Sequence, residues 1–257
     1  MREDSDIIKY IKKFDILDNY LKLIEPFSSN MTDNKIKENL ISSSKYWIPS
    51  QENWEISNGN VVFLKNHNAK VIINNNSFTN NKLSLAVIHI VRDPRDVVVS
   101  FSHFLNKDYD WVIEKMCNDN YWTFFDQGNK TFDFISTWKT NFLPWTEVKG
   151  VPRILIRYED LIYSCYIEFT KIMKFLSEIL NIEVEEEKIL FCIEKSKFEI
   201  LSKYEKDNKF SENNEIKNYS KFFRKGEVGQ WRKNLNKKQI LRIEDTFFDE
   251  MTNMKYL

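Results

Sequence analysis

Three short segments of the chain carry side chains that could bind an anion and accept a proton. They contain Lys65 and His67, Arg92 and Ser100, and Arg224, Lys225 and Gly226. Imidazole titrates near neutral pH, so a histidine can take the proton of an attacking hydroxyl or amine. Guanidinium and ammonium groups bind phosphate oxygens, and glycine lets the backbone approach a ligand closely. These residue types predict an anion-binding site with a base beside it.

The second segment has the pattern of a strand, a tight turn and a helix. An apolar run over 86–91 ends at Arg92, and Asp93 and Pro94 follow at once. Aspartate is a favoured N-cap residue, and proline is tolerated at the first helical position because its missing N–H needs no partner there. We therefore expect a buried strand that presents Arg92 beside a helix N-terminus, a place that favours anions.

Two other predicted strands also end in polar side chains. An apolar run over 61–65 leads to His67, and a run over 153–157 leads to Tyr158 and Glu159. Helical patterns separate the three strands, which predicts βαβ units and a mainly parallel sheet. Because the carboxyl ends of parallel strands lie at one rim of a sheet, the three endings are expected to line that rim.

The third segment, 224–231, concentrates the chain's glycines. The sequence has five glycines in 257 residues, and Gly226 and Gly229 both fall within these eight positions. Arg224 and Lys225 precede them directly. The segment is therefore predicted to be a loop whose backbone and basic side chains come close to an anion.

These segments resemble those of the sulfotransferases that use 3′-phosphoadenosine 5′-phosphosulfate (PAPS). The matching patterns are Lys-x-His at 65–67, Arg-x-x-x-Asp-x-x-x-Ser at 92–100, Tyr-Glu-Asp-Leu at 158–161 and Arg-Lys-Gly-x-x-Gly-x-Trp at 224–231. They occur in the family's order, and the resemblance covers about residues 10–257. It implies a P-loop-kinase-like α/β fold, a three-layer sandwich around a mainly parallel sheet, in a single domain of residues 1–257.

The resemblance also implies a role for each site residue. His67 would be the general base, and Lys65 would support the transition state. Tyr158 would lie by the nucleotide and Phe198 against the adenine, although core packing is an open alternative for both. No metal is implied. The residues that would hold the 3′-phosphate are Arg92, Ser100, Arg224, Lys225 and Gly226.

The sequence departs from the family pattern at two places. Family members begin with a strand and a Pro-x-Ser-Gly-x-Thr-Trp loop, whose backbone amides hold the 5′-phosphosulfate, and this sequence has no such segment. Three explanations stay open: a truncated product of a longer reading frame, a slot filled by a partner or a rearranged N-terminal segment, or a degenerate member that binds nucleotide without turnover. Gln230 replaces the family's aspartate, which we expect to affect loop closure more than phosphate binding.

Hydrophobic periodicity predicts the remaining elements. Helices are expected over 5–25, 166–181, 185–196 and 237–248, and much of the aromatic-rich region 109–148 should also be helical. A hairpin or loop is expected over 70–83. The region 27–60 is predicted to be polar and broken, with Trp47 and Trp54 as packing anchors, and 202–221 is predicted to be a surface loop. His89 and His103 are expected to be structural.

Composition narrows the class of protein further. Lys and Arg total 38, as do Asp and Glu, and this balance argues against a general nucleic-acid binder. The N-terminus does not resemble a signal peptide, and no apolar run reaches transmembrane length, so we expect a cytoplasmic protein with no membrane partner. Cys117, Cys165 and Cys192 match no metal or redox spacing and are expected to be buried, reduced thiols.

The expected function is transfer of a sulfuryl group from PAPS to a hydroxyl or amine of a small-molecule or glycan acceptor. The alternative is a catalytically impaired module that binds PAPS or its product 3′,5′-ADP without turnover. A nucleotide kinase is disfavoured because the chain has no Gly-x-x-x-x-Gly-Lys run. The sequence predicts neither the acceptor nor the oligomeric state.

Overall fold

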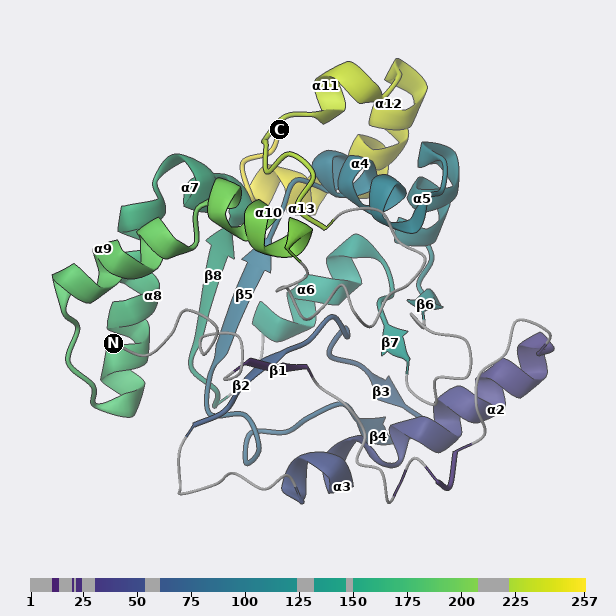
Figure 1. Ribbon diagram of the computed structural model, residues 1–257. Coiled ribbons are helices and arrows are strands. Elements are labelled where there is room, and N and C mark those ends of the chain that lie inside the picture. The colour runs from purple at the N-terminus through teal and green to yellow at the C-terminus, as the bar shows by residue number, and fades with distance from the viewer. Residues whose placement is uncertain are drawn as a thin grey trace.

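Strands and helices alternate along the chain, and the strands that carry the predicted site are parallel (Figure 1). The computed structural model describes residues 11–13, 20, 22–24, 31–53, 61–123, 132–146, 150–207 and 222–257. Strand β5 (Val87–Val91) pairs with β8 (Arg153–Arg157), and β2 (Phe63–Lys65) pairs with β1 (Ile11–Lys13). The predicted α/β class with parallel strands is therefore confirmed. In the described residues these strands form two separate pairs.

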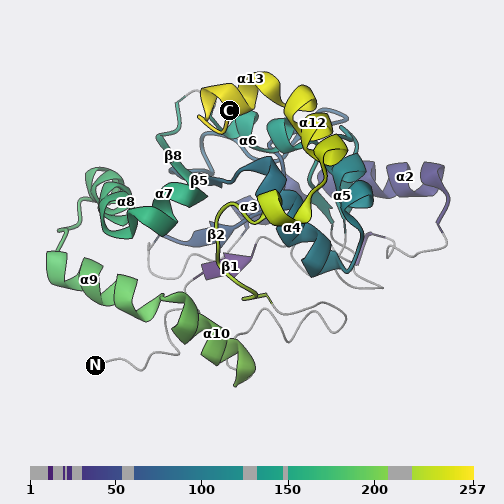
Figure 2. The same cartoon turned by 90° about the horizontal axis from the view of Figure 1, so that it is seen from above.

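Helices beyond the carboxyl end of β5 build the larger core (Figures 1 and 2). They are α4 (Pro94–Leu105), α5 (Tyr109–Met116), α11 (Trp231–Asn234), α12 (Lys237–Thr246) and α13 (Phe248–Asn253). Helix α4 packs against α5, α11 and α12, and its residues Val98 and Val99 are buried. Burial of this apolar face holds the C-terminal region against the end of β5. The core consists of Val91, Val98, Val99, Val112, Ile113, Met116, Trp138, Phe142, Leu235, Ile243, Phe247 and Met251.

A second group of helices follows β8 along the chain (Figure 1). It comprises α7 (Tyr158–Tyr163), α8 (Cys165–Leu180), α9 (Glu186–Lys195) and α10 (Phe198–Lys206). The bounds of α8 and α9 confirm the helices predicted over 166–181 and 185–196. Helix α8 packs against both β8 and α9. None of the described helices is long and apolar enough to cross a membrane.

The remaining elements surround a smaller aromatic core. They are α2 (Asp33–Ser44), α3 (Trp47–Glu52), α6 (Trp138–Thr146), the pair β3 (Ile72–Ile73) and β4 (Asn76–Ser77), and the pair β6 (Trp122–Thr123) and β7 (Asp133–Phe134). Trp47 is only 1% exposed and packs near Phe78 and Phe132. Its predicted role as a packing anchor is confirmed, whereas Trp54 lies outside the described residues.

Local sequence signals explain the turns that position the site. The Asp93 carboxylate accepts the Arg95 N–H at 2.9 Å, and Pro94 opens α4, as the sequence predicts. Asn74 and Asn75 have φ values of 47° and 68° between the two strands of the hairpin predicted over 70–83. Asparagine tolerates this left-handed region better than most residues, which fits the tight turn.

Several predicted elements are corrected by the structure. Ile11–Lys13 form β1, so the helix predicted over 5–25 is wrong there, because pairing with β2 overrides a helical periodicity. Most of that predicted helix lies outside the described residues. Helices α2 and α3 occupy much of 27–60, and α10 continues to Lys206, so the loop predicted over 202–221 begins later. Residues 208–221 lie outside the described residues.

The cysteines are free, as predicted, but they are not buried. Cys117 and Cys165 are half-buried and Cys192 is exposed, so the prediction of burial is wrong. Partial burial raises the pKa of the Cys117 and Cys165 thiols above their ordinary value. A raised pKa keeps these two side chains in the unreactive thiol form.

Candidate functional site

One cavity of about 1570 Å³ brings the three predicted segments together. All nine predicted site residues line it: Lys65, His67, Arg92, Ser100, Tyr158, Phe198, Arg224, Lys225 and Gly226. They come from the ends of β2, β5 and β8, from helices α4 and α10, and from the segment before α11. The strand endings that were expected at one rim of the sheet thus line one cavity, and their functional roles stay predictions.

The cavity runs along the edges of two strands. Consecutive residues 61–68 and 83–92 line it, although successive side chains of a strand point to opposite faces. A cavity touched by every residue of β2 and β5 must therefore follow the strand edges. Within the described residues β5 pairs with β8 alone and β2 with β1 alone, and Ile90 in the middle of β5 is 53% exposed.

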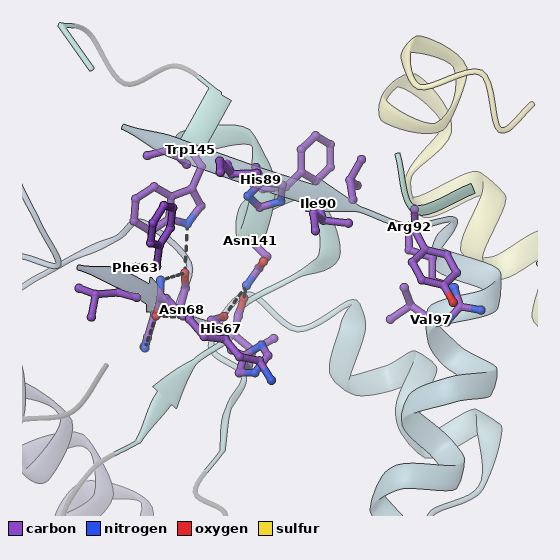
Figure 3. Close-up of a pocket in the computed structure, with 18 of the residues that line it drawn as sticks. Phe63, His67, Asn68, His89, Ile90, Arg92, Val97, Asn141 and Trp145 are labelled. Carbon is purple, nitrogen blue, oxygen red and sulfur yellow. Dashed lines mark hydrogen bonds between the residues drawn. The ribbon is translucent and has the colours of Figure 1, made fainter. Parts of the chain in front are cut away.

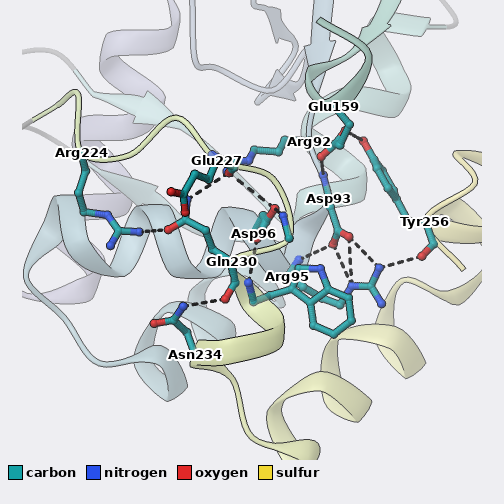
Figure 4. Close-up of polar contacts among 12 residues, drawn as sticks. Arg92, Asp93, Arg95, Asp96, Glu159, Arg224, Glu227, Gln230, Asn234 and Tyr256 are labelled. Atoms are coloured by element: carbon teal, nitrogen blue, oxygen red, sulfur yellow. Dashed lines mark hydrogen bonds and ion pairs between the residues drawn. The ribbon is translucent and has the colours of Figure 1, made fainter. Parts of the chain in front are cut away.

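Arg92 is held at the carboxyl end of β5 by contacts with three residues. Its guanidinium lies over the Tyr158 ring at 4.3 Å from the centroid. Its Nη2 donates to the carbonyl of Glu227 at 2.8 Å (Figure 4). Nη2 also lies 3.8 Å from the Asp96 carboxylate. Among the described residues, Nε of Arg92 is buried and has no hydrogen-bond partner. The guanidinium is thus fixed in place with a donor still unused.

The contact with Arg92 also affects the pKa of Tyr158. Burial raises the pKa of its phenol, while the positive charge of Arg92 opposes that rise. The ring therefore stays neutral and offers a face to the guanidinium. Tyr158 lines the cavity and contacts Arg92, and its role beside the nucleotide stays a prediction.

Helix α4 contributes a residue that the sequence analysis set aside. Ser100 is exposed and lines the cavity, and His103, one turn further along the helix, lines it as well. The pKa of His103 is lowered, first by burial and then by the positive charges of Arg224 and Lys225. The spacing of three between Ser100 and His103 places them on one helix face, and it could have identified His103.

The glycine-containing segment approaches the aromatic wall very closely. Gly226 has a φ of +64°, and a Cβ built on it would lie 2.6 Å from the Phe198 ring. Only glycine fits both the conformation and the contact. Phe198 also meets the Phe223 ring edge-on at 6.1 Å. Phe198 therefore lines the cavity and packs against the backbone of the segment that carries Arg224 and Lys225.

Gln230, where the family pattern has aspartate, lies inside this segment (Figure 4). Its side-chain oxygen accepts a hydrogen bond from Nη2 of Arg224, and its amide nitrogen donates to the Glu227 carbonyl at 3.1 Å. Both contacts are internal to the loop. They fit the expectation that Gln230 acts on loop conformation rather than on a ligand directly.

The turn after β2 positions Lys65 and His67 (Figure 3). Nδ2 of Asn141 donates to the carbonyl of His67 at 3.0 Å. Asn68 is buried, and its carbonyl accepts Nε1 of Trp145 at 3.1 Å. Nζ of Lys65 lies 5.3 Å from the centre of the Phe222 ring. Asn68 and Asn141 were missed by the sequence analysis, because nothing in their local spacing marks them.

His89 also lines the cavity, near the middle of β5 (Figure 3). Burial lowers its pKa to about 4, so the imidazole is neutral at physiological pH. Its ring lies 6.1 Å from that of Phe142, a core residue. These contacts suit a packing role for His89 on the apolar side of the cavity.

The residues present suit a phosphate group at one end of the cavity. The basic side chains of Arg92, Arg224 and Lys225 line the cavity, and the Glu227 carbonyl that accepts from Arg92 also accepts from Gln230, the partner of Arg224. The buried Nε of Arg92 is a donor without a partner among the described residues. Charge-assisted hydrogen bonds from arginine are the usual means of binding phosphate. Among the residues that the structure describes, no group of three or more His, Cys, Asp or Glu side chains could hold a metal ion.

Comparison with known proteins shows similarity to sulfotransferases. A family model described as "Sulfotransferase domain" matches residues 19–255. The rabbit (Oryctolagus cuniculus) amine sulfotransferase is 29% identical over 182 residues, which make up 68% of this chain and 56% of that protein. Sulfotransferase 2A1 of Macaca fascicularis is 29% identical over 177 residues, or 65% of this chain and 57% of that protein. The chain thus spans little more than half the length of these relatives.

Solved structures share the fold. A mouse sulfotransferase complexed with PAP superposes with a TM-score of 0.54 at 20% identity, covering 76% of this chain and 66% of that one. Retinol dehydratase in a complex with retinol and PAP gives a TM-score of 0.56 at 19% identity, covering 91% and 65%. At these identities the likeness concerns the fold, whereas the family model spans most of the sequence. The chain belongs to the sulfotransferase family.

Proposed function

We propose that this protein binds PAPS and transfers its sulfuryl group to the hydroxyl or amine of a small-molecule acceptor. One observation carries the proposal: the cavity that holds three cations at one end also holds His67 and Lys65. An anionic cosubstrate and a base for the acceptor can therefore meet in one space. The span of the family model, 19–255, supports treating the chain as one sulfotransferase unit.

The cationic end would hold the nucleotide. Arg92, Arg224 and Lys225 would bind the 3′-phosphate through charge-assisted hydrogen bonds. Ser100 would donate its hydroxyl, and Gly226 would bring its backbone close. Tyr158 and Phe198 would border the nucleoside, since both rings line the same cavity. PAP, which is bound in two of the similar structures, is the product left when PAPS gives up its sulfuryl group.

His67 and Lys65 would act at the reacting end. The acceptor oxygen or nitrogen forms a bond to sulfur, the bond from sulfur to the 5′-phosphate oxygen breaks, and that phosphate keeps the electron pair. His67 takes the acceptor's proton as the new bond forms. Lys65 offsets the negative charge that develops on the leaving phosphate. Asn141 and Asn68 hold the turn that carries this pair.

The side chains near His67 support an apolar acceptor. Phe63, His89 and Trp145 line the cavity on the side of His67 (Figure 3), and the Phe142 ring lies 6.1 Å from that of His89, whose pKa is lowered to about 4 by burial. A neutral, mainly aromatic wall suits an apolar acceptor molecule that carries a hydroxyl or amine group better than it suits a highly polar glycan. The related proteins include an amine sulfotransferase and a retinol dehydratase seen with retinol.

The second candidate function is nucleotide binding without turnover. It is favoured by the placement of the basic side chains: Arg92, Arg224 and Lys225 line one cavity and can bind a phosphate whether or not transfer follows. The proposed contacts of Arg92 and Arg224 with the 3′-phosphate do not require a reaction at the sulfuryl group. Binding of 3′,5′-ADP is thus expected under both functions, and transfer only under the first.

Two measurements separate these functions. Isothermal titration with 3′,5′-ADP measures binding, and transfer of ³⁵S from labelled PAPS to a panel of phenols, sterols and arylamines measures turnover. We expect His67→Ala to abolish transfer and to keep 3′,5′-ADP binding, with Lys82→Ala at an exposed position as a control. Binding by the wild-type protein with no transfer to any acceptor would support the second function. Absence of binding would overturn both.

A further inference from the structure

The segment Phe222–Trp231, here named the strap, is fastened at both ends by buried carboxylates. At its start, Glu205 accepts the backbone N–H of Phe222 at 2.6 Å and that of Phe223 at 2.9 Å. At its end, Asp96 accepts the N–H of Gly229 at 2.6 Å and that of Trp231 at 3.0 Å. Each carboxylate uses one oxygen for each N–H.

The two carboxylates are almost fully removed from water. Glu205 is 6% exposed and Asp96 is 1% exposed. Burial of a carboxylate is costly unless it is paired and hydrogen-bonded. The backbone N–H groups of the strap supply those bonds, and Arg92 adds a positive charge 3.8 Å from Asp96. The strap and its two anchors therefore stabilise each other, although Glu205 is on α10 and Asp96 is on α4.

Between the anchors lie the groups proposed to bind the 3′-phosphate. Arg224, Lys225 and Gly226 line the cavity and directly follow Phe223, the last residue whose N–H is bound by Glu205. The carbonyl of Glu227, further along, accepts the hydrogen bond from Arg92 (Figure 4). The strap is thus held at three points, and the third is Arg92 at the end of β5.

We propose that Glu205 and Asp96 are positioning residues for the nucleotide: they fix the strap so that Arg224 and Lys225 face Arg92 before the ligand arrives. A loop ordered in advance does not lose conformational entropy on binding, which strengthens affinity. The inference rests on the proposed nucleotide site and goes beyond it by assigning a positioning role to two residues outside the set proposed to bind the 3′-phosphate.

The test replaces one carboxylate oxygen at a time by an amide nitrogen. Glu205→Gln and Asp96→Asn keep the side-chain size, but the new NH₂ group faces a backbone N–H that it cannot accept. Glu199→Gln on α10 and Asp245→Asn on α12 are matched controls at exposed positions. Because the anchors are on different helices, one variant that fails to fold leaves the other informative.

Two readouts are needed. In the protein without ligand, hydrogen exchange followed by mass spectrometry should show the amides of residues 222–231 exchanging about tenfold faster in the variants. The amides of α12 should keep their wild-type protection. Titration with 3′,5′-ADP should show dissociation constants raised about tenfold, with the controls unchanged.

The outcomes are distinguishable. A wild-type protein that fails to bind 3′,5′-ADP overturns the proposed function and the positioning role with it. If the wild-type protein binds and both variants match its affinity, only the positioning role is overturned. Unchanged exchange of the strap amides in both variants contradicts the anchoring itself, whatever the affinities. Faster exchange together with weaker binding supports the proposal.

Discussion

The hydroxyl of Tyr256 donates to the carboxylate of Glu159 at 2.9 Å and so ties the C-terminal end of the chain to the residue after Tyr158 (Figure 4). The second oxygen of Glu159 accepts the backbone N–H of Asp93 at 3.0 Å. Glu159 is buried. One carboxylate therefore joins the ends of β5 and β8 to the C-terminal tail, directly beside Arg92.

Tyr256→Phe tests this junction. Burial and the negative charge of Glu159 raise the pKa of the Tyr256 phenol, so it stays protonated and remains a donor. Phenylalanine keeps the ring whose centre lies 4.7 Å from the guanidinium of Arg157. It removes the hydrogen bond that one buried oxygen of Glu159 accepts from the Tyr256 hydroxyl. The free energy of unfolding should fall by about 2 kcal/mol, measured by urea denaturation. Tyr163→Phe, at a side chain that is 73% exposed, should change it little. An equal loss in both variants would contradict the junction.

Arg92→Lys tests the geometry of the cationic end separately from its charge. Lysine keeps the positive charge but lacks the planar fork that lies on the Tyr158 ring while it donates to the Glu227 carbonyl. The affinity for 3′,5′-ADP should fall at least about tenfold, as measured by titration calorimetry. Arg242→Lys, at an exposed position on α12, is the control. Wild-type affinity in Arg92→Lys would show that charge alone matters at this position.

His103→Gln tests a pH dependence that the sequence analysis did not foresee. In the free protein, burial and the charges of Arg224 and Lys225 lower the pKa of His103 below its ordinary value of 6.5, so the imidazole is neutral at pH 7. A bound phosphate offsets those charges and raises the pKa. Binding should then take up a proton, and affinity should rise as pH falls between the bound and free pKa values.

The measurement must separate His103 from the phosphate itself. A phosphate monoester has a second pKa of about 6, and its own protonation weakens binding at low pH, which is the opposite direction. Titration calorimetry near pH 6.5, in buffers of different ionisation enthalpy, counts the protons taken up. The wild-type protein should take up more protons than His103→Gln. Equal proton uptake by the two proteins would rule out the coupling.

The end of the cavity that contains Arg92 and Gly226 was the most predictable part of this molecule. Arg92, Asp93 and Pro94 are consecutive, and their roles at a strand end and a helix start follow from local physics, so the sequence predicts them well. Gly226 was predictable for a similar reason, since a scarce residue stood where a close approach was needed. In each case the cause of the structure lies within a few residues of the position concerned.

Residues whose role depends on distant partners were not predictable. Glu205 and Asp96 hold one strap from two helices, and Asp96 meets Gly229 across 133 positions of sequence. The strand at Ile11–Lys13 has a helical periodicity and is a strand only because β2 lies beside it. A local pattern contains no information about such tertiary partners, which override it.

Asn68→Asp tests the turn that carries His67. Nδ2 of Asn68 donates to the Asp133 carboxylate at 2.9 Å, and its Oδ1 accepts the Phe134 N–H at 2.7 Å. Aspartate has the same shape but replaces the donor by an oxygen that faces another carboxylate. Both groups could then be ionised only at a high cost, so the new carboxyl should keep its proton to an unusually high pH. Its pKa would be raised in the folded state, and its destabilising effect should therefore be small at low pH and grow as pH rises.

The free energy of unfolding, measured as a function of pH, tests whether the destabilisation grows as pH rises. Relative to the wild-type protein, the variant's free energy of unfolding should be lower by about 3 kcal/mol at pH 8, and the deficit should shrink towards pH 4. Asn120→Asp, at an exposed position, should show no such trend. Because His67 adjoins the turn, transfer should fall with Asn68→Asp at pH 8 even where the protein remains folded. A variant as stable as the wild-type protein at pH 8 would mean that the contact between Asn68 and Asp133 does not hold this turn.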